Sequence, residues 1–233
     1  MTHFNMKQVI VLFGAPGAGK GTQAELLSDK LSLYYFETSK ILEQEFNNPA
    51  EEVVEIDGEK FEVADEKQLW LEGKLCSPPF VTYLVKKKIK ELADQGENLI
   101  LAGSPRTVYE GENIIPLLLE LYGKENIKFV LINISPEATM HRNSNRRICE
   151  LMRHPILYTE ETKNLTICPL DGSNLIKRKG LDDPETIKTR LEEYANRTFP
   201  VVELFKKNDI AVKEINGEQS VADVFKDILK AIK

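Results

Sequence analysis

Cysteine, histidine and tryptophan are scarce in this chain of 233 residues, which has three cysteines, three histidines and one tryptophan. Three cysteines are an odd number and too few for a disulfide scaffold, so we expect free thiols or metal ligands. Positive charge is not in excess either, because the formal net charge is -6. Nucleic-acid binding needs a basic face that displaces counterions from phosphates, so we expect no nucleic-acid partner and only a local anion site.

Long apolar runs are also lacking. The first run, residues 9–13, is too short for the core of a signal peptide, and no cleavage pattern follows it. No stretch approaches the length that crosses a membrane, so we expect a cytoplasmic protein without a membrane partner. With 42% hydrophobic and 29% charged residues, the chain can bury a core, and we expect one domain over residues 1–233 with insertions.

Short apolar runs alternate with helical patterns along the chain. Four runs have the length of strands: residues 9–13, 98–102, 129–134 and 211–215. After the first run, Ala24, Leu27 and Leu31 recur at helical spacing. This alternation predicts an α/β fold in which helical crossovers connect parallel strands.

The segment GAPGAGKGT, residues 14–22, falls at the turn between the first strand and the first helix. Its glycines allow backbone N–H groups to face phosphate oxygens, the helix N-terminus adds partial positive charge, and Lys20 adds a full charge. Gly21 stands where the strict P-loop pattern has a hydroxyl, which follows at Thr22 and would help to hold magnesium. A tight turn without a ligand is the alternative, but the strand, helix and lysine together favour a phosphate site.

Five motifs follow one another over nearly the whole chain: GAPGAGKGTQA from residue 14, EGKL at 72–75, GSPRT at 103–107, RNSNRR at 142–147 and DDPETIKTRLEEY at 182–194. In this order they resemble the motifs of the adenylate kinase family of nucleoside monophosphate kinases. The resemblance implies a P-loop three-layer fold, with a five-stranded parallel sheet, helices on both faces and two flap insertions. It also implies a monomeric enzyme that uses ATP with Mg²⁺ and phosphorylates a nucleoside monophosphate, by default AMP.

The same resemblance assigns roles to individual residues. The ATP-binding residues would be Gly17, Ala18, Gly19, Lys20, Gly21, Thr22, Arg142 and Gln219. The catalytic residues would be Lys20, Arg106, Arg146, Arg178 and Arg190, with Lys179 as the alternative to Arg178. The acceptor-binding residues would be Thr38, Lys74, Leu75, Cys76, Gly103, Arg106 and Glu110. Arginines suit phosphoryl transfer because the migrating group spreads negative charge over its oxygens.

A helix start at residues 135–137 precedes two of these arginines. Serine, proline and glutamate there are typical of an N-cap and first turn. Arg142 and Arg146, four residues apart, would then project from one face of the helix and share an anion. A solvated basic face neutralised by nearby glutamates is the alternative.

The first insertion, residues 38–82, would be the monophosphate-binding flap. Within it, Asp57-Gly58 predicts a two-residue hairpin turn, with Glu55 opposite Lys60 on one face and apolar residues on the other. This hairpin is extra relative to the usual family pattern. We leave open whether it covers the site, contacts a second copy or selects the substrate.

The second insertion, residues 147–180, would be the lid. Many family members hold this lid together with zinc, bound by a C-x-x-C pair and a distant C-x-x-C or C-x-x-D pair. Here Met152 replaces one cysteine, and a thioether is a poor zinc ligand. Two alternatives remain: a metal-free lid, or a structural zinc site. The ligands of the zinc site would be Cys149, His154, Cys168 and Asp171.

Three positions depart from the family pattern. Glu43 stands where an arginine is expected for the acceptor phosphate, Ala102 where an aspartate is expected near the magnesium water shell, and Glu110 where a glutamine reads the acceptor adenine. These departures motivate two alternatives to an AMP kinase. One is a nucleotide-binding regulatory protein with weak catalysis, and the other is a kinase for a different monophosphate.

Overall fold

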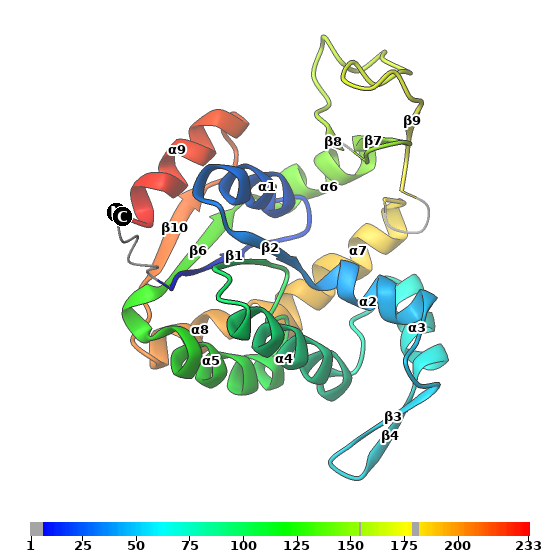
Figure 1. The fold of residues 1–233 in the computed structure, drawn as a ribbon. Coiled ribbons are helices and arrows are strands. Elements are labelled where there is room, and N and C mark those ends of the chain that lie inside the picture. The colour runs from blue at the N-terminus through cyan, green and yellow to red at the C-terminus, as the bar shows by residue number, and fades with distance from the viewer. Residues whose placement is uncertain (1–6, 154, 179–181) are drawn as a thin grey trace.

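A parallel five-stranded sheet forms the centre of the molecule in a computed structural model, which describes residues 7–153, 155–178 and 182–233 (Figure 1). The strands lie in the order β10-β6-β1-β5-β2. Their bounds are Val9–Phe13 for β1, Tyr34–Glu37 for β2, Leu99–Ala102 for β5, Ile127–Asn133 for β6 and Val212–Asn216 for β10. Every neighbouring pair is parallel, which confirms the α/β prediction.

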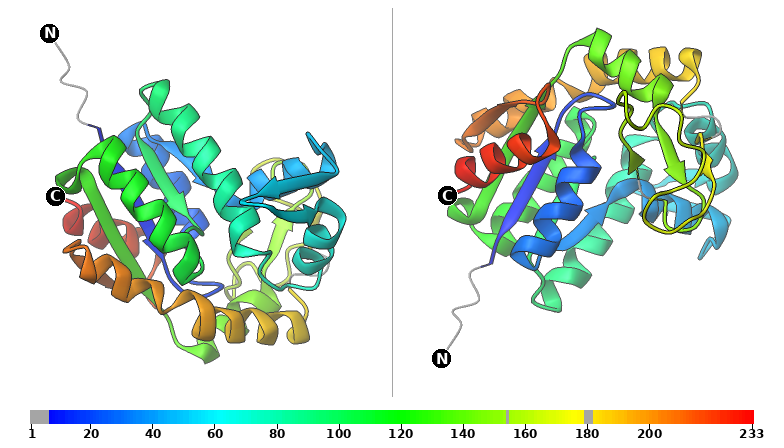
Figure 2. Two further views of the ribbon diagram at one scale, coloured as in Figure 1. Left: turned by 90° about the horizontal axis from the view of Figure 1, so that it is seen from below. Right: turned by 90° about the horizontal axis from the view of Figure 1, so that it is seen from above.

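Helices cover both faces of the sheet (Figures 1 and 2). One face carries α1 (Lys20–Leu31) and α9 (Val221–Ala231), and the other carries α4 (Pro78–Asp94), α5 (Val108–Tyr122) and α8 (Val201–Lys207). The chain also forms α6 (Pro136–Asn145), α7 (Pro184–Glu193), a 3₁₀ turn at Lys124–Asn126 and a π-helical turn at Tyr194–Thr198. The expected three-layer architecture is therefore confirmed.

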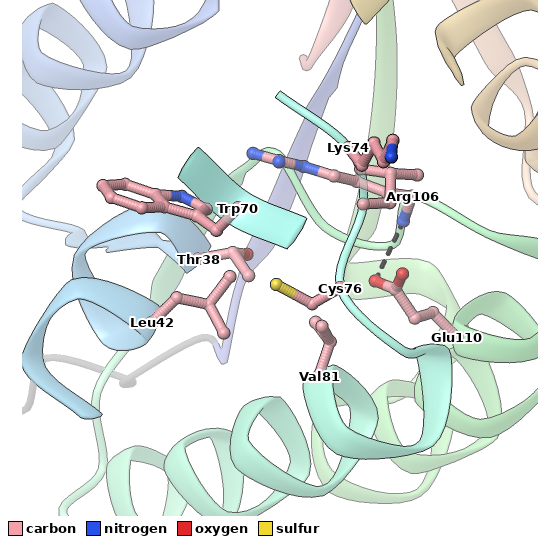
Figure 3. A pocket seen from close by; sticks show the side chains of 9 residues that line it. Thr38, Leu42, Trp70, Lys74, Cys76, Val81, Arg106 and Glu110 are labelled. Carbon is pink, nitrogen blue, oxygen red and sulfur yellow. Dashed lines mark hydrogen bonds between the residues drawn. The ribbon is translucent and has the colours of Figure 1, made fainter. Parts of the chain in front are cut away.

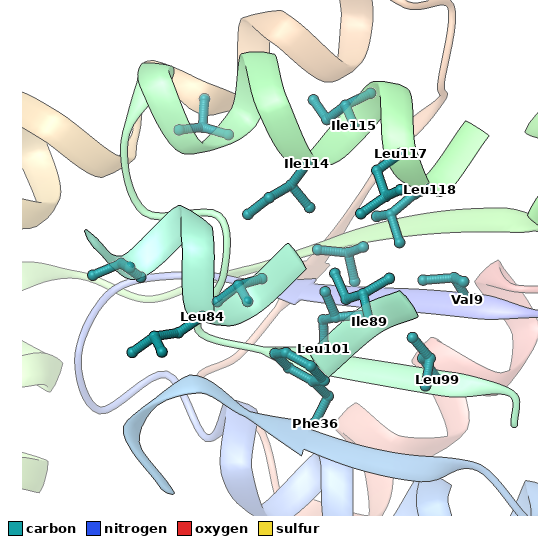
Figure 4. Packing of buried hydrophobic residues seen from close by; sticks show 14 of the residues in the cluster. Val9, Phe36, Leu84, Ile89, Leu99, Leu101, Ile114, Ile115, Leu117 and Leu118 are labelled. Atoms are coloured by element: carbon teal, nitrogen blue, oxygen red, sulfur yellow. The ribbon is translucent and has the colours of Figure 1, made fainter. Parts of the chain in front are cut away.

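The core consists of two apolar layers, one on each face of the sheet. Along β1, Val9 and Val11 contribute to the layer under α4, α5 and α8, while Ile10 and Leu12 contribute to the layer under α1 and α9. Figure 4 shows the first of these layers, in which side chains from α4 and α5 pack over β1, β5 and β2. Because both faces are buried, the central strands are continuous apolar runs instead of alternating ones.

The first insertion contains α2 (Thr38–Asn47), the hairpin β3 (Val53–Ile56) and β4 (Glu59–Glu62), and α3 (Val63–Leu71). The hairpin turn has positive φ at both Asp57 and Gly58, as a type I′ turn requires. Glu55 pairs with Lys60, as predicted. The hairpin projects away from the central sheet in Figure 1, whereas α4 packs on that sheet.

The second insertion carries a small antiparallel sheet in the order β8-β7-β9. Its strands are β7 (Arg147–Cys149), β8 (Pro155–Ile156) and β9 (Leu175–Ile176). Figure 1 places both insertions on the side of the molecule where α6 and α7 lie. None of the helices in the described ranges is long and apolar enough to span a bilayer.

Candidate active site

The glycine loop connects β1 directly to the first turn of α1. Gly19, with a φ of 90°, is the N-cap residue of α1. Gly17, with a φ of 85°, packs so closely on α6 that a Cβ there would lie 2.7 Å from Asn143 Nδ2. Lys20 Nζ donates hydrogen bonds to the carbonyl oxygens of Gly14 (2.6 Å) and Ala15 (3.0 Å). An ammonium group therefore lies over a backbone loop at a helix N-terminus, an arrangement suited to phosphate.

Three arginines raise the positive potential at Lys20. Burial, and then the charges of Arg106, Arg190 and Arg146, lower the pKa of Lys20 to about 7. Burial and the neighbouring arginines likewise lower the pKa of Arg190 to about 9. These side chains come from the β5–α5 turn, α7 and the residue after α6. Four cations from separate elements thus converge on one region, which a polyphosphate would neutralise.

Asp182 forms ion pairs with an arginine at each end of the lid, Arg146 and Arg178. Its carboxylate, whose residue is only 3% exposed, accepts hydrogen bonds from Arg178 Nη2 (3.0 Å) and from the guanidinium of Arg146. Burial opposes ionisation of this carboxyl, but the hydrogen bonds and charges of the two arginines outweigh it, so the Asp182 pKa lies below its usual range. Lys179, the alternative to Arg178, lies outside the described residues.

The expectation that Arg142 and Arg146 project from one helix face is wrong. Helix α6 ends at Asn145, and Arg146 has extended backbone, with a ψ of 134°. Arg142 instead donates to the carbonyl oxygens of Gly217 (2.8 Å) and Gly17 (3.4 Å). The two guanidinium groups therefore lie in different parts of the site. Arg142 lies between the glycine loop and the turn after β10, and Arg146 lies at the start of the lid.

Gln219, an expected ATP-binding residue, lies in the same turn as Gly217. Its side-chain nitrogen donates to Asn216 O (2.8 Å) and to Asp227 Oδ2 (3.1 Å). The side chain thus shapes the turn that Arg142 contacts. Thr22 lies in the first turn of α1, two residues after Lys20, and is partly exposed.

A pocket between the flap and the sheet collects most of the expected acceptor residues (Figure 3). It is lined by Thr38, Leu42, Trp70, Lys74, Leu75, Cys76, Val81, Arg106 and Glu110. Six of the seven expected residues are in this set, and the carbonyl oxygen of the seventh, Gly103, accepts a hydrogen bond from Arg106 Nε. A Cβ on Gly103 would approach Arg106 Nη2 to 2.7 Å, so a side chain there would displace the guanidinium.

Sequence reasoning missed the apolar members of this pocket. Leu42, Trp70 and Val81 look like ordinary core residues in the sequence, although Trp70 stands just before the EGKL motif. The hydroxyl of Thr38 is buried and has no hydrogen-bond partner in the described part of the chain. Because Thr38 lines the pocket, a bound ligand could supply the missing partner.

Glu110 holds the turn that carries Arg106. Its carboxylate, in a residue that is 2% exposed, accepts hydrogen bonds from the Arg106 backbone N–H (3.0 Å) and the Thr107 hydroxyl (3.1 Å). Thr107 is the N-cap residue of α5, and its hydroxyl oxygen accepts in return from the Glu110 backbone N–H. Burial raises the pKa of Glu110, against these hydrogen bonds. Glu43, by contrast, is exposed and does not line the pocket.

Three of the four expected zinc ligands converge in the lid. Ligand atoms of Cys149, Cys168 and Asp171 lie within 4.8 Å of one another, and both cysteines are buried. Hydrogen bonds, first from the Cys149 thiol and then from Ser173, hold the pKa of Asp171 well below its usual range. Met152 is 62% exposed, and His154 lies outside the described residues. Two thiols and a carboxylate are donors that zinc accepts.

The comparisons with known proteins agree with these motifs. The profile of a family described as adenylate kinase matches residues 12–210. An adenylate kinase of Caldicellulosiruptor saccharolyticus is 32% identical over 225 residues, which cover 96% of this chain and 98% of that protein. Adenylate kinases of Caldicellulosiruptor bescii and Petrotoga mobilis are 33% and 32% identical, with 96% of this chain and 98% and 97% of those proteins covered.

Proposed function

The chain belongs to the adenylate kinase family and is a nucleoside monophosphate kinase, and we propose that it transfers the γ-phosphoryl group of ATP to AMP and forms two ADP. The choice of site rests on the pocket between the flap and the sheet, here called the flap pocket, in which Arg106 lies with five other expected acceptor residues. Arg106 also contributes to the positive potential at Lys20. The charge of Arg106 would therefore act on the phosphates of both ATP and the acceptor.

The donor site would consist of the glycine loop, Lys20 and Arg142. Lys20 would bind the ATP phosphates, and Arg142, held by Gly217 O and Gly17 O, would flank the donor base. When bound with ATP, magnesium would supply positive charge that neutralises the phosphate oxygens. The Thr22 hydroxyl, a hard oxygen donor in the first turn of α1, fits this ion and would hold it.

The acceptor site would bind AMP with its phosphate against Arg106 and its base among Leu42, Trp70 and Val81. Glu110 would act indirectly, because its carboxylate is already occupied by the turn at 104–107. The Thr38 hydroxyl would supply a hydrogen bond to the base or the ribose. No general base is required, because an AMP phosphate oxygen is itself the nucleophile.

Arginines would clamp the phosphoryl group in flight. Arg190 lies on α7, and Arg146 and Arg178 are held by Asp182 at the two ends of the lid. When the lid closes, the negative charge of the transferring group would compete with Asp182 for these two guanidinium groups. Closure would also exclude water from the reacting phosphates.

We also propose that the lid binds structural zinc through Cys149, Cys168 and Asp171, with His154 as the fourth ligand. The convergence of three donors supports this choice over a metal-free lid. The metal would stabilise the lid and would take no part in phosphoryl transfer.

Intrinsic fluorescence tests the acceptor assignment, because Trp70 is the sole tryptophan and lines the pocket. We expect AMP to change the Trp70 emission saturably, and CMP, UMP and GMP to do so only at much higher concentration. An Arg106→Ala variant should weaken the AMP response by about tenfold or more, since a charge-assisted phosphate contact is lost. A response to another monophosphate in preference to AMP would refute the AMP assignment and name the acceptor.

A further inference from the structure

The glycine loop follows the carboxyl end of β1, and one of the other parallel strands ends in an acid. The last residues of the five strands are Glu37, Ala102, Phe13, Asn133 and Asn216. Among these strand ends, Glu37 alone has a carboxylate. In open α/β sheets the ligand lies at this edge, so the strand ends are close to the phosphates.

The register of the sheet places Glu37 beside Ala102 on the neighbouring strand. Two residues earlier, Tyr35 pairs with Ile100. Ile100 and Ala102 belong to the apolar layer under α1, and Tyr35 packs against that layer. Because side chains alternate along a strand, Glu37 shares the face of Tyr35, which is the face that carries α1 and the glycine loop.

Tyr35 connects Glu37 to the first turn of α1. The Tyr35 hydroxyl is hydrogen-bonded to the Glu37 carboxylate, and burial together with this carboxylate raises the Tyr35 pKa. A Cβ on Gly21 would lie 3.3 Å from that hydroxyl oxygen. Gly21 is flanked by Lys20 and Thr22. The Tyr35 side chain therefore lies between the Glu37 carboxylate and Gly21, whose two neighbours are the residues assigned to phosphate and metal.

Two further contacts fix the carboxylate of Glu37. Ser39 Oγ donates to Oε1 (3.0 Å), and Lys40 Nζ lies 3.3 Å from Oε2. The Lys40 side chain is 63% exposed and also lies over the Tyr35 ring, 5.1 Å from its centroid. The Glu37 side chain itself remains 28% exposed, so it is oriented but still accessible to solvent.

Two buried acids near the site have other partners, and Glu25 on α1 adds a second negative charge near Tyr35. Asp182 pairs with Arg146 and Arg178, and Glu110 accepts from the turn that precedes α5. Within the described ranges, Glu37 is thus the acid at the strand ends that remains accessible beside the glycine loop. Magnesium usually keeps several water molecules, and carboxylates that accept hydrogen bonds from such waters orient the ion.

We propose that Glu37 is a positioning residue for the magnesium ion of the bound nucleotide, acting through a water molecule of the ion's shell. The proposal rests on the proposed kinase function, and it assigns to β2 the carboxylate that Ala102 lacks on β5. Tyr35, Ser39 and Lys40 hold the carboxylate in place for this contact.

The test compares the affinity for ATP with magnesium and with EDTA, measured by calorimetry without an acceptor. In Glu37→Gln we expect the affinity for Mg-ATP to fall about tenfold, as for loss of one charge-assisted hydrogen bond. The affinity for metal-free ATP should stay the same or rise, because a negative charge near the phosphates is removed. Asp29→Asn, at an exposed position on α1, is the matched control and should leave both affinities unchanged.

A second carboxylate provides a rescue experiment. Because Ala102 pairs with Glu37, an Ala102→Asp substitution in the Glu37→Gln background should restore most of the magnesium preference. A purely structural role for Glu37 would not be rescued in this way. Tyr35→Phe removes one holder of the carboxylate and should lower the magnesium preference by a smaller factor, which keeps the proposal testable if Glu37→Gln fails to fold.

The inference is overturned if Glu37→Gln, or Tyr35→Phe where the former is unfolded, retains the wild-type ratio of Mg-ATP to ATP affinity. It is also overturned if both affinities fall equally. These outcomes leave the proposed function intact when the wild-type protein forms ADP from ATP and AMP. The absence of turnover in wild-type protein would refute the kinase proposal separately.

Discussion

Lys20 carries its charge in surroundings that oppose ionisation, since burial and three arginines lower its pKa to about 7. Phosphates would favour the charged form and raise that pKa in the complex. We therefore predict that ATP binding takes up a proton between pH 7 and 9, and that ATP affinity falls as pH rises through this range. Calorimetry at pH 8 in two buffers with different ionisation enthalpies measures this uptake. Binding heats that do not depend on the buffer would contradict the prediction.

Glu110 gives a second prediction for a single residue. In Glu110→Gln, one carboxylate oxygen becomes an amide NH₂ group that faces hydrogen-bond donors of the 104–107 turn. We predict that the variant loses about 1–3 kcal/mol of unfolding free energy in urea, as for an unsatisfied buried polar group. Unchanged stability together with a changed KM for AMP would show instead that residue 110 reads the base directly.

At the scale of elements, the contact between the two ends of the lid depends on Asp182. Removing its charge in Asp182→Asn would leave Arg146 and Arg178 adjacent and unneutralised. We predict a loss of about 3–5 kcal/mol, the usual cost of breaking a buried ion pair from one side. The lowered Asp182 pKa means that this contribution is present above about pH 4 and is lost as pH falls further. Urea unfolding of wild type and variant at pH 7 and pH 3 measures both effects, and equal stabilities at pH 7 would contradict them.

The lid itself carries the metal prediction. Protein purified without chelator should contain about one zinc ion per chain, as a tetrahedral structural site implies. EDTA should lower the unfolding temperature of the wild type, and Cys149→Ser should lose both the metal and the response to EDTA. A metal-free protein whose unfolding temperature is insensitive to EDTA would identify the hydrogen-bonded cluster around Asp171 as the native arrangement.

The elements that sequence could predict are those whose local chemistry leaves little choice. The three central strands β6, β1 and β5 are almost entirely buried, and the Asp57-Gly58 turn requires two positive φ angles. Tyr34–Glu37 does not stand out as an apolar run in the sequence, because it ends in an acid and only Phe36 within it is buried. The sequence also does not show where α6 ends, because no glycine or proline marks Asn145 as its last residue.

For the whole molecule, the motifs predicted which residues form the site but not how they pair. The flap pocket collects the acceptor residues that the resemblance assigns. The pairing of Asp182 with Arg146 and the position of Glu37 beside Ala102 join residues that are distant in sequence, so local pattern cannot reveal them. The contacts of Glu110 with Thr107 and of Arg178 with Asp182 are local, and the T-x-x-E spacing at 107–110 was the signal for the first of them.

Turnover tests the proposed kinase function most directly. Purified protein is incubated with Mg²⁺, ATP and AMP, CMP, UMP or GMP, and the diphosphates are separated by chromatography, with Lys20→Ala as the blank. We expect Lys20-dependent formation of two ADP for each AMP consumed, with the other acceptors much slower. ATP binding that is lost in Lys20→Ala, without diphosphate formation from any acceptor, would contradict the kinase function and leave a nucleotide-binding protein that does not transfer the phosphoryl group.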